Sequence, residues 1–186
     1  MPRITKVTTR RGDDGKTDLA DGKRIRKDSK RIQAIGSLDE LNSAIGSARA
    51  QNPQPETAAR LREIQNDLFC LGSMLSRKSP APRKIAGPVL DPGRIEAVER
   101  DIAALQERLG PLENFLLPGG APCAAGMHVA RAVCRRAERD VIALSRSASV
   151  ASEVRIYLNR LSDLLFQYAR LENKAAGLSE TFWKSR

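Results

Sequence analysis

Hydrophobic residues along most of the chain recur every three or four positions, which is the spacing of one face of an α-helix. The clearest run consists of Leu61, Ile64, Leu68, Leu71 and Leu75. Together with the helix-breaking residues that lie between these runs, the pattern predicts five helices. They cover residues 37–51, 55–76, 91–109, 122–145 and 152–176. Amphipathic helices with short connections pack against their neighbours in opposite directions. We therefore expect an all-α, five-helix bundle, with an antiparallel four-helix core and one further helix.

Capping and breaking residues mark the predicted helix ends. Ser37 and Glu40 form a Ser-x-x-Glu capping box at the start of the first helix. Asp91 followed by Pro92 matches an N-cap with proline in the first helical position. Gly177 follows the last helix, and glycine is the usual residue there because it tolerates the left-handed backbone of a helix end.

Residues 1–36 lack helical periodicity and contain several glycines, so we expect a loop there, with a short extended stretch at 4–8. The 186 residues contain no obvious linker, and this length suits one domain with a proper core. We therefore divide a single domain, 1–186, into an N-terminal loop (1–36), a helical bundle (37–177) and a tail (178–186).

The fourth and fifth predicted helices each have an apolar face that we expect in the core. On the fourth helix this face consists of Met127, Ala130, Cys134, Ala137, Val141 and Leu144. On the fifth it consists of Val154, Leu158, Leu161, Leu165 and Tyr168. Hydrophobic residues make up 41% of the chain and aromatic residues only 4%, which favours packed helices over a β-sandwich or barrel.

The chain carries a net charge of +10, and much of it lies near the start, where residues 1–36 hold 11 Lys and Arg against five Asp. A basic segment indicates an anionic partner, either a nucleotide, a nucleic acid or a membrane surface. Composition alone favours nucleic acid. However, the scarcity of aromatic residues for base stacking and the lack of a nucleic-acid-binding motif count against it.

The three cysteines are spaced singly, which predicts free, mostly buried thiols in a reducing compartment, and hence the cytoplasm. No apolar run approaches the ~18 residues of a membrane span, and residues 1–9 lack the apolar segment of a signal peptide. His128 is the only histidine. One histidine cannot build the paired Glu-x-x-His sites of a di-iron bundle, and a buried or edge histidine is the ordinary alternative to a functional one.

The fourth predicted helix also carries a charged row beside its apolar face. The row consists of His128, Arg131, Arg135, Glu138 and Arg139, with Arg136 next to it. One interpretation is an ordinary solvated basic face. The other is a phosphate-binding site, because guanidinium groups match the geometry of phosphate oxygens.

Asn159 and Asp163 lie four residues apart on another face of the fifth helix. Short polar side chains are poor choices for a helix interior. They are either surface residues, or partners of a ribose, a base or an arginine of the fourth helix.

The run Gly15-Lys16-Thr17 resembles the end of a P-loop, but the motif also requires glycine at position 10, which is Arg10. Two interpretations remain. The segment is either a flexible basic loop, or a turn whose backbone N–H groups bind phosphate.

Four blocks of the sequence, in this order, resemble the PduO-type ATP:cob(I)alamin adenosyltransferase family. They are residues 9–17, residues 27–42, residues 115–120 (Phe-Leu-Leu-Pro-Gly-Gly) with 128–139, and residues 157–166. The last two blocks are the most specific, and the similarity covers nearly the whole chain. The resemblance implies a five-helix bundle that forms a homotrimer with active sites between subunits. It also implies an enzyme that transfers the 5′-deoxyadenosyl group of ATP, taken with Mg²⁺, to the cobalt of cob(I)alamin.

The resemblance also implies roles for individual residues. The nucleotide loop would supply Thr9, Arg10, Arg11, Gly12, Thr17 and Asp18, and Lys27 would contact phosphate. The helical part of the ATP site would consist of Arg135, Arg136, Glu138, Arg139 and Asn159. Phe115 and Asp163 would lie at the corrinoid, and Asp39 would pair with Arg131 across the subunit interface. Arg135, Asp163 and Arg131 would be the catalytic residues. Mg²⁺ would come with ATP, with no protein ligand assigned. A corrinoid reductase and an adenosylcobalamin-dependent enzyme are the partners to expect.

The sequence departs from the family pattern at three positions, with Thr8 in place of the usual Tyr, Met127 in place of Leu, and Asp18 in place of Ser, Thr or Gly. An acid beside polyphosphate is unfavourable unless Mg²⁺ or Arg10 offsets its charge. Two alternatives to the enzyme stay open. One is a non-catalytic corrinoid or nucleotide carrier of the same fold, and the other is a basic nucleic-acid-binding helical bundle.

Overall fold

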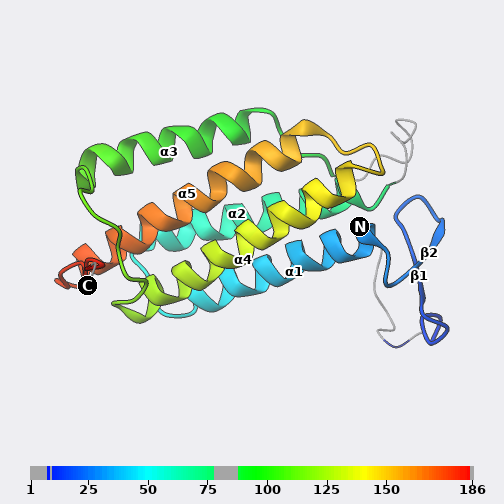
Figure 1. Cartoon of the computed structure of the whole chain (residues 1–186), viewed down its shortest axis with the longest axis horizontal. Coiled ribbons are helices and arrows are strands. Elements are labelled where there is room, and N and C mark those ends of the chain that lie inside the picture. Colours follow the sequence, from blue (N-terminus) through cyan, green and yellow to red (C-terminus); the bar gives the residue numbers. More distant parts are fainter. Residues whose placement is uncertain (1–7, 9, 78–87, 185–186) are drawn as a thin grey trace.

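Five α-helices dominate the computed structural model, which describes residues 8, 10–77 and 88–184. The helices are α1 (Lys30–Arg49), α2 (Pro55–Leu75), α3 (Gly93–Leu109), α4 (Pro122–Ser145) and α5 (Ser152–Ala175). Consecutive helices run in opposite directions (Figure 1). α1 packs between α2 and α4, α4 packs on α5, and α3 lies on the outside against α5. The predicted all-α, five-helix bundle is confirmed.

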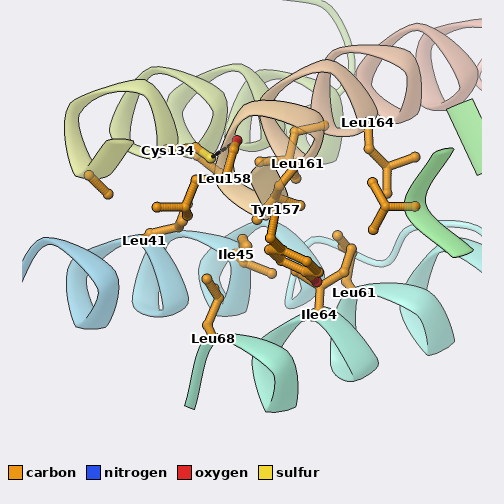
Figure 2. Close-up of a cluster of buried hydrophobic side chains, with 14 of the residues drawn as sticks. Leu41, Ile45, Leu61, Ile64, Leu68, Cys134, Tyr157, Leu158, Leu161 and Leu164 are labelled. Carbon is orange, nitrogen blue, oxygen red and sulfur yellow. Dashed lines mark hydrogen bonds between the residues drawn. The ribbon is translucent and has the colours of Figure 1, made fainter. Parts of the chain in front are cut away.

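The hydrophobic core lies where α1, α2, α4 and α5 meet. Figure 2 shows Leu41 of α1, Ile64 of α2 and Tyr157 of α5 directed into this core. All residues of the two apolar faces predicted for α4 and α5 are buried. Each large side chain buried in this way contributes roughly 1.5–3 kcal/mol. The Tyr157 hydroxyl is satisfied within this core, because its Oη donates to Asp67 Oδ2 at 2.7 Å.

α1 begins at Lys30 and not at the predicted Ser37. Ser29 is the N-cap, and its hydroxyl oxygen accepts a hydrogen bond from the backbone N–H of Ile32 at 3.4 Å. Ser37 instead lies buried within the helix, where its hydroxyl donates to Asp140 of α4. The predicted capping box and the predicted 36/37 boundary between loop and bundle are therefore wrong.

The longer α1 is explained by tertiary contacts that outweigh a helix-breaking residue. Gly36 lies inside the helix, where glycine costs only about 1 kcal/mol relative to alanine. Arg31, in the added first turn, is buried and donates to the carbonyl oxygens of Leu75 (2.6 Å) and Arg77 (2.7 Å). These bonds satisfy a buried cation and attach the start of α1 to the end of α2.

The remaining helix ends lie within one or two residues of the prediction. α3 begins at Gly93 with Pro92 as its N-cap residue, and the Asp91 carboxylate accepts the backbone N–H of Gly93 at 3.0 Å. α4 spans the predicted residues, and α5 ends at Ala175, just before Gly177 (φ 68°).

A short β-hairpin precedes the bundle, where a loop was expected. Strand β1 (Lys16–Asp18) pairs antiparallel with β2 (Arg24–Arg26), with Thr17 opposite Ile25. The hairpin lies at the end of the bundle where α1 begins (Figure 1). A hydrogen bond from the N–H of Ala20 to the carbonyl of Ser76 attaches it to the end of α2. The extended stretch predicted at 4–8 lies, apart from residue 8, outside the described residues.

Candidate functional site

The polar rows predicted on α4 and α5 meet on one surface of the bundle. Asn159 Nδ2 donates to Glu138 Oε1 at 3.1 Å, and Arg160 Nη1 donates to Asn159 Oδ1 at 2.7 Å. Arg135 and Arg139 are exposed beside this pair, and Arg139 donates to the carbonyl oxygen of Arg135. The Arg135 guanidinium makes no ion pair with any described residue. This surface therefore presents exposed cations next to a preorganised carboxylate–amide pair.

Arg136 differs from its neighbours because it faces α1. Its guanidinium pairs with Glu40 at 2.5 Å. The hydrogen bond from Arg136 lowers the pKa of Glu40, and the charge attraction adds to the effect. The cation of Arg136 is thus balanced within its own chain, and it joins α4 to α1.

The predicted nucleotide loop forms a compact turn before and within the hairpin. Lys27 Nζ donates to the carbonyl oxygen of Gly12 at 2.8 Å, which closes the turn across its base. Arg10 is exposed and has a left-handed backbone (φ 58°). Thr17 lies half-buried in β1, and Thr9 lies outside the described residues. Several cations and backbone groups are therefore concentrated in one small segment.

The unusual acid of this loop, Asp18, is neutralised locally. Its carboxylate lies 3.2 Å from Arg11 and 3.6 Å from Arg24. Arg24 also donates to Asp14, whose pKa is lowered mainly by the backbone N–H of Lys16. Arg11 and Arg24, and not Arg10, thus offset the charge of Asp18 in this structure.

A groove of about 620 Å³ lies between the hairpin, α1 and α2. Its walls include Thr17, Asp18 and Asp39. The Arg135–Asn159 surface is formed instead by α4 and α5. Thr17 and Asp18 thus line a groove to which none of the helical residues predicted to bind the same ATP contributes.

A second cavity, of about 660 Å³, lies at the other end of the α4–α5 surface, and we call it the aromatic cavity after the three aromatic residues in its lining. Phe115, Phe166 and Trp183 line it together with Arg131. The Phe115 side chain is 81% exposed, so it is not a plug of the hydrophobic core. The Arg131 guanidinium carbon lies 5.9 Å from the centroid of the Phe166 ring, which is a cation–π distance.

Two predicted acidic residues are exposed. Asp163 lies one turn beyond Asn159 on α5, and Asp39 lies on α1. Among the described residues, neither carboxylate forms an ion pair, and Arg131 Nε is buried without a hydrogen-bond partner. The predicted Asp39–Arg131 pair is therefore not formed within one chain.

Comparison with known proteins decides the family. Residues 7–172 match the family model described as cobalamin adenosyltransferase. The chain belongs to the cobalamin adenosyltransferase family. It is 43% identical to the cobalamin adenosyltransferase of Cupriavidus metallidurans, over 98% of this chain and 96% of that protein. It is 39% identical to a corrinoid adenosyltransferase of Citrobacter freundii, over 90% and 94% of the two chains.

Solved structures of the same family support the fold. The chain is similar to a phenylalanine-to-alanine variant of the PduO-type ATP:corrinoid adenosyltransferase from Lactobacillus reuteri, complexed with cobalamin and ATP. The TM-score is 0.89 at 30% identity, with 97% of this chain and 100% of that chain covered. The range matched by the family model, residues 7–172, includes all four blocks that suggested an adenosyltransferase from sequence.

Sequence reasoning missed the part that the tail plays in this adenosyltransferase fold. Residues 178–184 pair with the loop before α4 through an antiparallel bridge between Leu116 and Phe182. The N–H of Trp183 donates to the carbonyl of Phe115 at 2.7 Å, which brings the indole into the aromatic cavity. The two aromatic residues of the tail were the available signal, because such residues are seldom used in a segment without contacts.

His128 and two of the three cysteines, Cys123 and Cys134, are buried, whereas Cys70 is half-buried. His128 is buried and packs edge-on against Phe166 at 6.0 Å. Desolvation lowers the pKa of His128, and the nearby charge of Arg131 lowers it further. Burial raises the pKa of Cys123 to about 12, and the three cysteines are free thiols, as predicted. The described residues contain no cluster of metal-ligating side chains, and no described helix is long and apolar enough to cross a membrane.

Proposed function

We propose that this protein transfers the 5′-deoxyadenosyl group of ATP to the cobalt of cob(I)alamin, giving adenosylcobalamin and triphosphate. The observation that carries the proposal is the order of groups along α5. Asn159, with Arg135 beside it on α4, comes first, Asp163 follows, and Phe166 at the aromatic cavity comes last. Asn159 and Phe166 are seven positions apart, or about 10 Å along a helix. A nucleotide bound near Asn159 and a corrin ring bound near Phe166 would face each other along this part of α5.

The reaction itself needs little acid or base catalysis. The electron pair of cob(I)alamin attacks C5′ of ATP, and a cobalt–carbon bond forms. The C5′–oxygen bond breaks, and its electron pair leaves with the triphosphate. The protein therefore has to align C5′ with cobalt and stabilise the charge that develops on the leaving group.

Arg135 is suited to the second task. Its guanidinium is exposed and unpaired within the described chain, whereas Arg136 is occupied by Glu40. A fixed cation facing the departing triphosphate interacts more strongly in the transition state than in the ground state. Asn159 and Glu138 would hold the nucleoside, since their donor and acceptor groups are already oriented by one another.

The aromatic cavity is suited to the corrinoid. Cob(II)alamin is hard to reduce while a ligand occupies the lower axial position, and axial ligation is the means by which a protein tunes such a metal. An exposed Phe115 ring at this position would exclude water and the nucleotide tail of the corrinoid. The apolar face would favour a four-coordinate cob(II)alamin that an external reductase can convert to cob(I)alamin.

The complete site would be built between subunits. The loop with Thr17 and Asp18 faces the α1–α2 side, while Arg135 and Asn159 face the α4–α5 side. A second copy of the chain would bring these halves together, and Asp39 would then supply the missing partner of Arg131 Nε. This complementarity supports a homotrimer. Mg²⁺ would enter with the phosphates of ATP, whose oxygens are ligands that it prefers.

A single assay tests the function. The purified protein is mixed with ATP and chemically reduced cobalamin, and the corrinoid spectrum is followed. We expect catalytic conversion to the spectrum of adenosylcobalamin. Binding of either substrate without conversion would favour a carrier of the same fold, and affinity for RNA or DNA alone would favour a nucleic-acid-binding bundle.

A further inference from the structure

The last turns of α5 hold the loop that carries Phe115. Asn173 is buried at 8% exposure, and its side-chain amide spans two peptide groups of this loop. Asn173 Oδ1 accepts the N–H of Ala121 at 2.8 Å, and Nδ2 donates to the carbonyl oxygen of Gly119 at 3.1 Å. One side chain thus satisfies a partly buried donor and a partly buried acceptor on either side of Gly120.

The backbone conformation of Gly120 and its lack of a side chain allow this contact. Its backbone has φ 104°, a conformation that side chains other than glycine rarely adopt. A Cβ atom at this position would lie 2.0 Å from Asn173 Oδ1. The loop backbone and the amide of Asn173 are therefore in direct contact, with no room for any other residue between them.

A second buried side chain, one turn earlier on α5, holds the other end of the same loop. Arg170 is 5% exposed, donates to the carbonyl oxygen of Gly110 at 3.3 Å and pairs with Glu180 of the tail at 2.7 Å. The tail in turn contacts the carbonyl of Phe115 through the N–H of Trp183. The loop between α3 and α4 is therefore attached to α5 at its beginning and at its end.

Phe115 lies in the middle of this loop, and at 81% exposure its own ring contributes little to fixing its position. We infer that Asn173 is a positioning residue, which holds the Phe115 loop in the geometry required at the lower face of the corrinoid. The inference rests on the proposed function of Phe115. The amide is required in particular, because the position needs one donor and one acceptor at the same time.

Two substitutions test the need for the donor and for the acceptor of the Asn173 amide. Asn173→Ala removes both hydrogen bonds, whereas Asn173→Asp keeps the size and the acceptor for Ala121 but loses the donor for Gly119. A misplacement of about 1 Å at a reacting centre can cost on the order of 100-fold in rate. We expect kcat/KM for cob(II)alamin under mild reduction to fall roughly ten- to hundred-fold in both variants, with KM for ATP changed less than about threefold.

Glu172→Ala is the matched control. Glu172 is equally buried on the same turn, and its carboxylate accepts the N–H of Gln54 at 3.1 Å, so it attaches a different loop to α5. This variant should lose a similar amount of thermal stability while keeping the corrinoid parameters of the wild type. The direct readout is the EPR signal of four-coordinate cob(II)alamin in the presence of ATP, which should weaken in the Asn173 variants only.

The double variant Phe115→Ala/Asn173→Ala decides whether Asn173 acts through Phe115. If it does, the double variant should be no worse than Phe115→Ala alone, because the two losses share one cause. Additive losses, an undiminished four-coordinate signal in Asn173→Asp, or equal losses in Glu172→Ala would overturn the inference. Failure of the proposed function would look different, since the wild type would then form no adenosylcobalamin or Phe115→Ala would leave the signal unchanged.

Discussion

Asn159 of α5 donates a hydrogen bond to Glu138 of α4 across 3.1 Å. The bond joins the polar rows of two neighbouring helices and holds the carboxylate of Glu138 toward α5. Arg135, one turn earlier on α4, makes no ion pair with the described residues. The surface thus combines a fixed hydrogen-bonding pair with an available cation, which suits the proposed binding of a nucleoside triphosphate there.

Replacement of Arg135 by alanine should strongly reduce kcat and leave the fold intact. Loss of a preorganised group that stabilises transition-state charge costs roughly 100- to 1,000-fold in kcat. Arg135→Lys should recover only part of the rate, because an ammonium cannot donate the paired hydrogen bonds of a guanidinium. Steady-state kinetics measure the effect, and Arg146→Ala at the end of the same helix is the control. A near wild-type kcat in Arg135→Ala would show that this cation does not face the leaving group.

Replacement of Asp39 by alanine should weaken both assembly and activity. In the proposed trimer, its loss leaves Arg131 with an unpaired buried charge, which costs more than the pair contributes. Sedimentation velocity at micromolar concentration should show a shift from trimer to smaller species. Glu107→Ala, which removes an exposed acid from α3, should remain trimeric. A fully active, monodisperse monomer of the wild type would contradict the proposed assembly.

Replacement of Phe115 by alanine should affect the corrinoid and hardly affect ATP. Truncation of a core phenylalanine costs ~3–5 kcal/mol, but Phe115 is 81% exposed, so the melting temperature should stay close to that of the wild type. The four-coordinate cob(II)alamin signal should disappear, and preformed cob(I)alamin should restore much of the rate. Ile156→Ala, at another exposed apolar residue of the bundle, is the control for stability. A large loss of stability together with an unchanged EPR signal would rule out the role at the corrin face.

His128 should make the protein sensitive to mild acid. Because burial and Arg131 lower its folded-state pKa below the ordinary 6.5, the unfolded chain binds the proton more tightly. Its contribution to stability is therefore complete above about pH 6.5 and decreases as the pH falls below that value. Urea unfolding at pH 7.5 and 5.5 should show this loss in the wild type and less of it in His128→Gln. As the only histidine, it can also be titrated directly by NMR, and a pKa at or above 6.5 would contradict the prediction.

The helices of the bundle could be predicted because their apolar faces are long and regular. The start of α1 could not. Ser29 and Ser37 are both acceptable N-caps in sequence, and the choice depends on Arg31, whose carbonyl acceptors lie at the distant end of α2. The hairpin was missed for a similar reason, since strands of three residues carry too little periodicity to distinguish them from a loop.

Much of the candidate site was identified from motifs, but its arrangement was not. The family resemblance implied one ATP site for Arg135 and Asn159, and the Glu138–Asn159 bond brings their helices together. Helical spacing placed Arg136 beside the charged row that contains Arg135, but only the packing of α4 on α1 shows that Arg136 pairs with Glu40. The aromatic residues of the tail indicated a contact, but the sequence did not show that the loop before α4 makes it. The two segments are far apart in the chain.

The central claim is group transfer from ATP to cobalt, and product stoichiometry tests it most directly. Purified protein, ATP, Mg²⁺ and chemically generated cob(I)alamin are incubated anaerobically, and adenosylcobalamin and triphosphate are quantified together. The account predicts many turnovers, with one triphosphate released for each adenosylcobalamin formed and little of either product from Arg135→Ala. Absence of adenosylcobalamin, or its formation without an equal amount of triphosphate, would contradict the account.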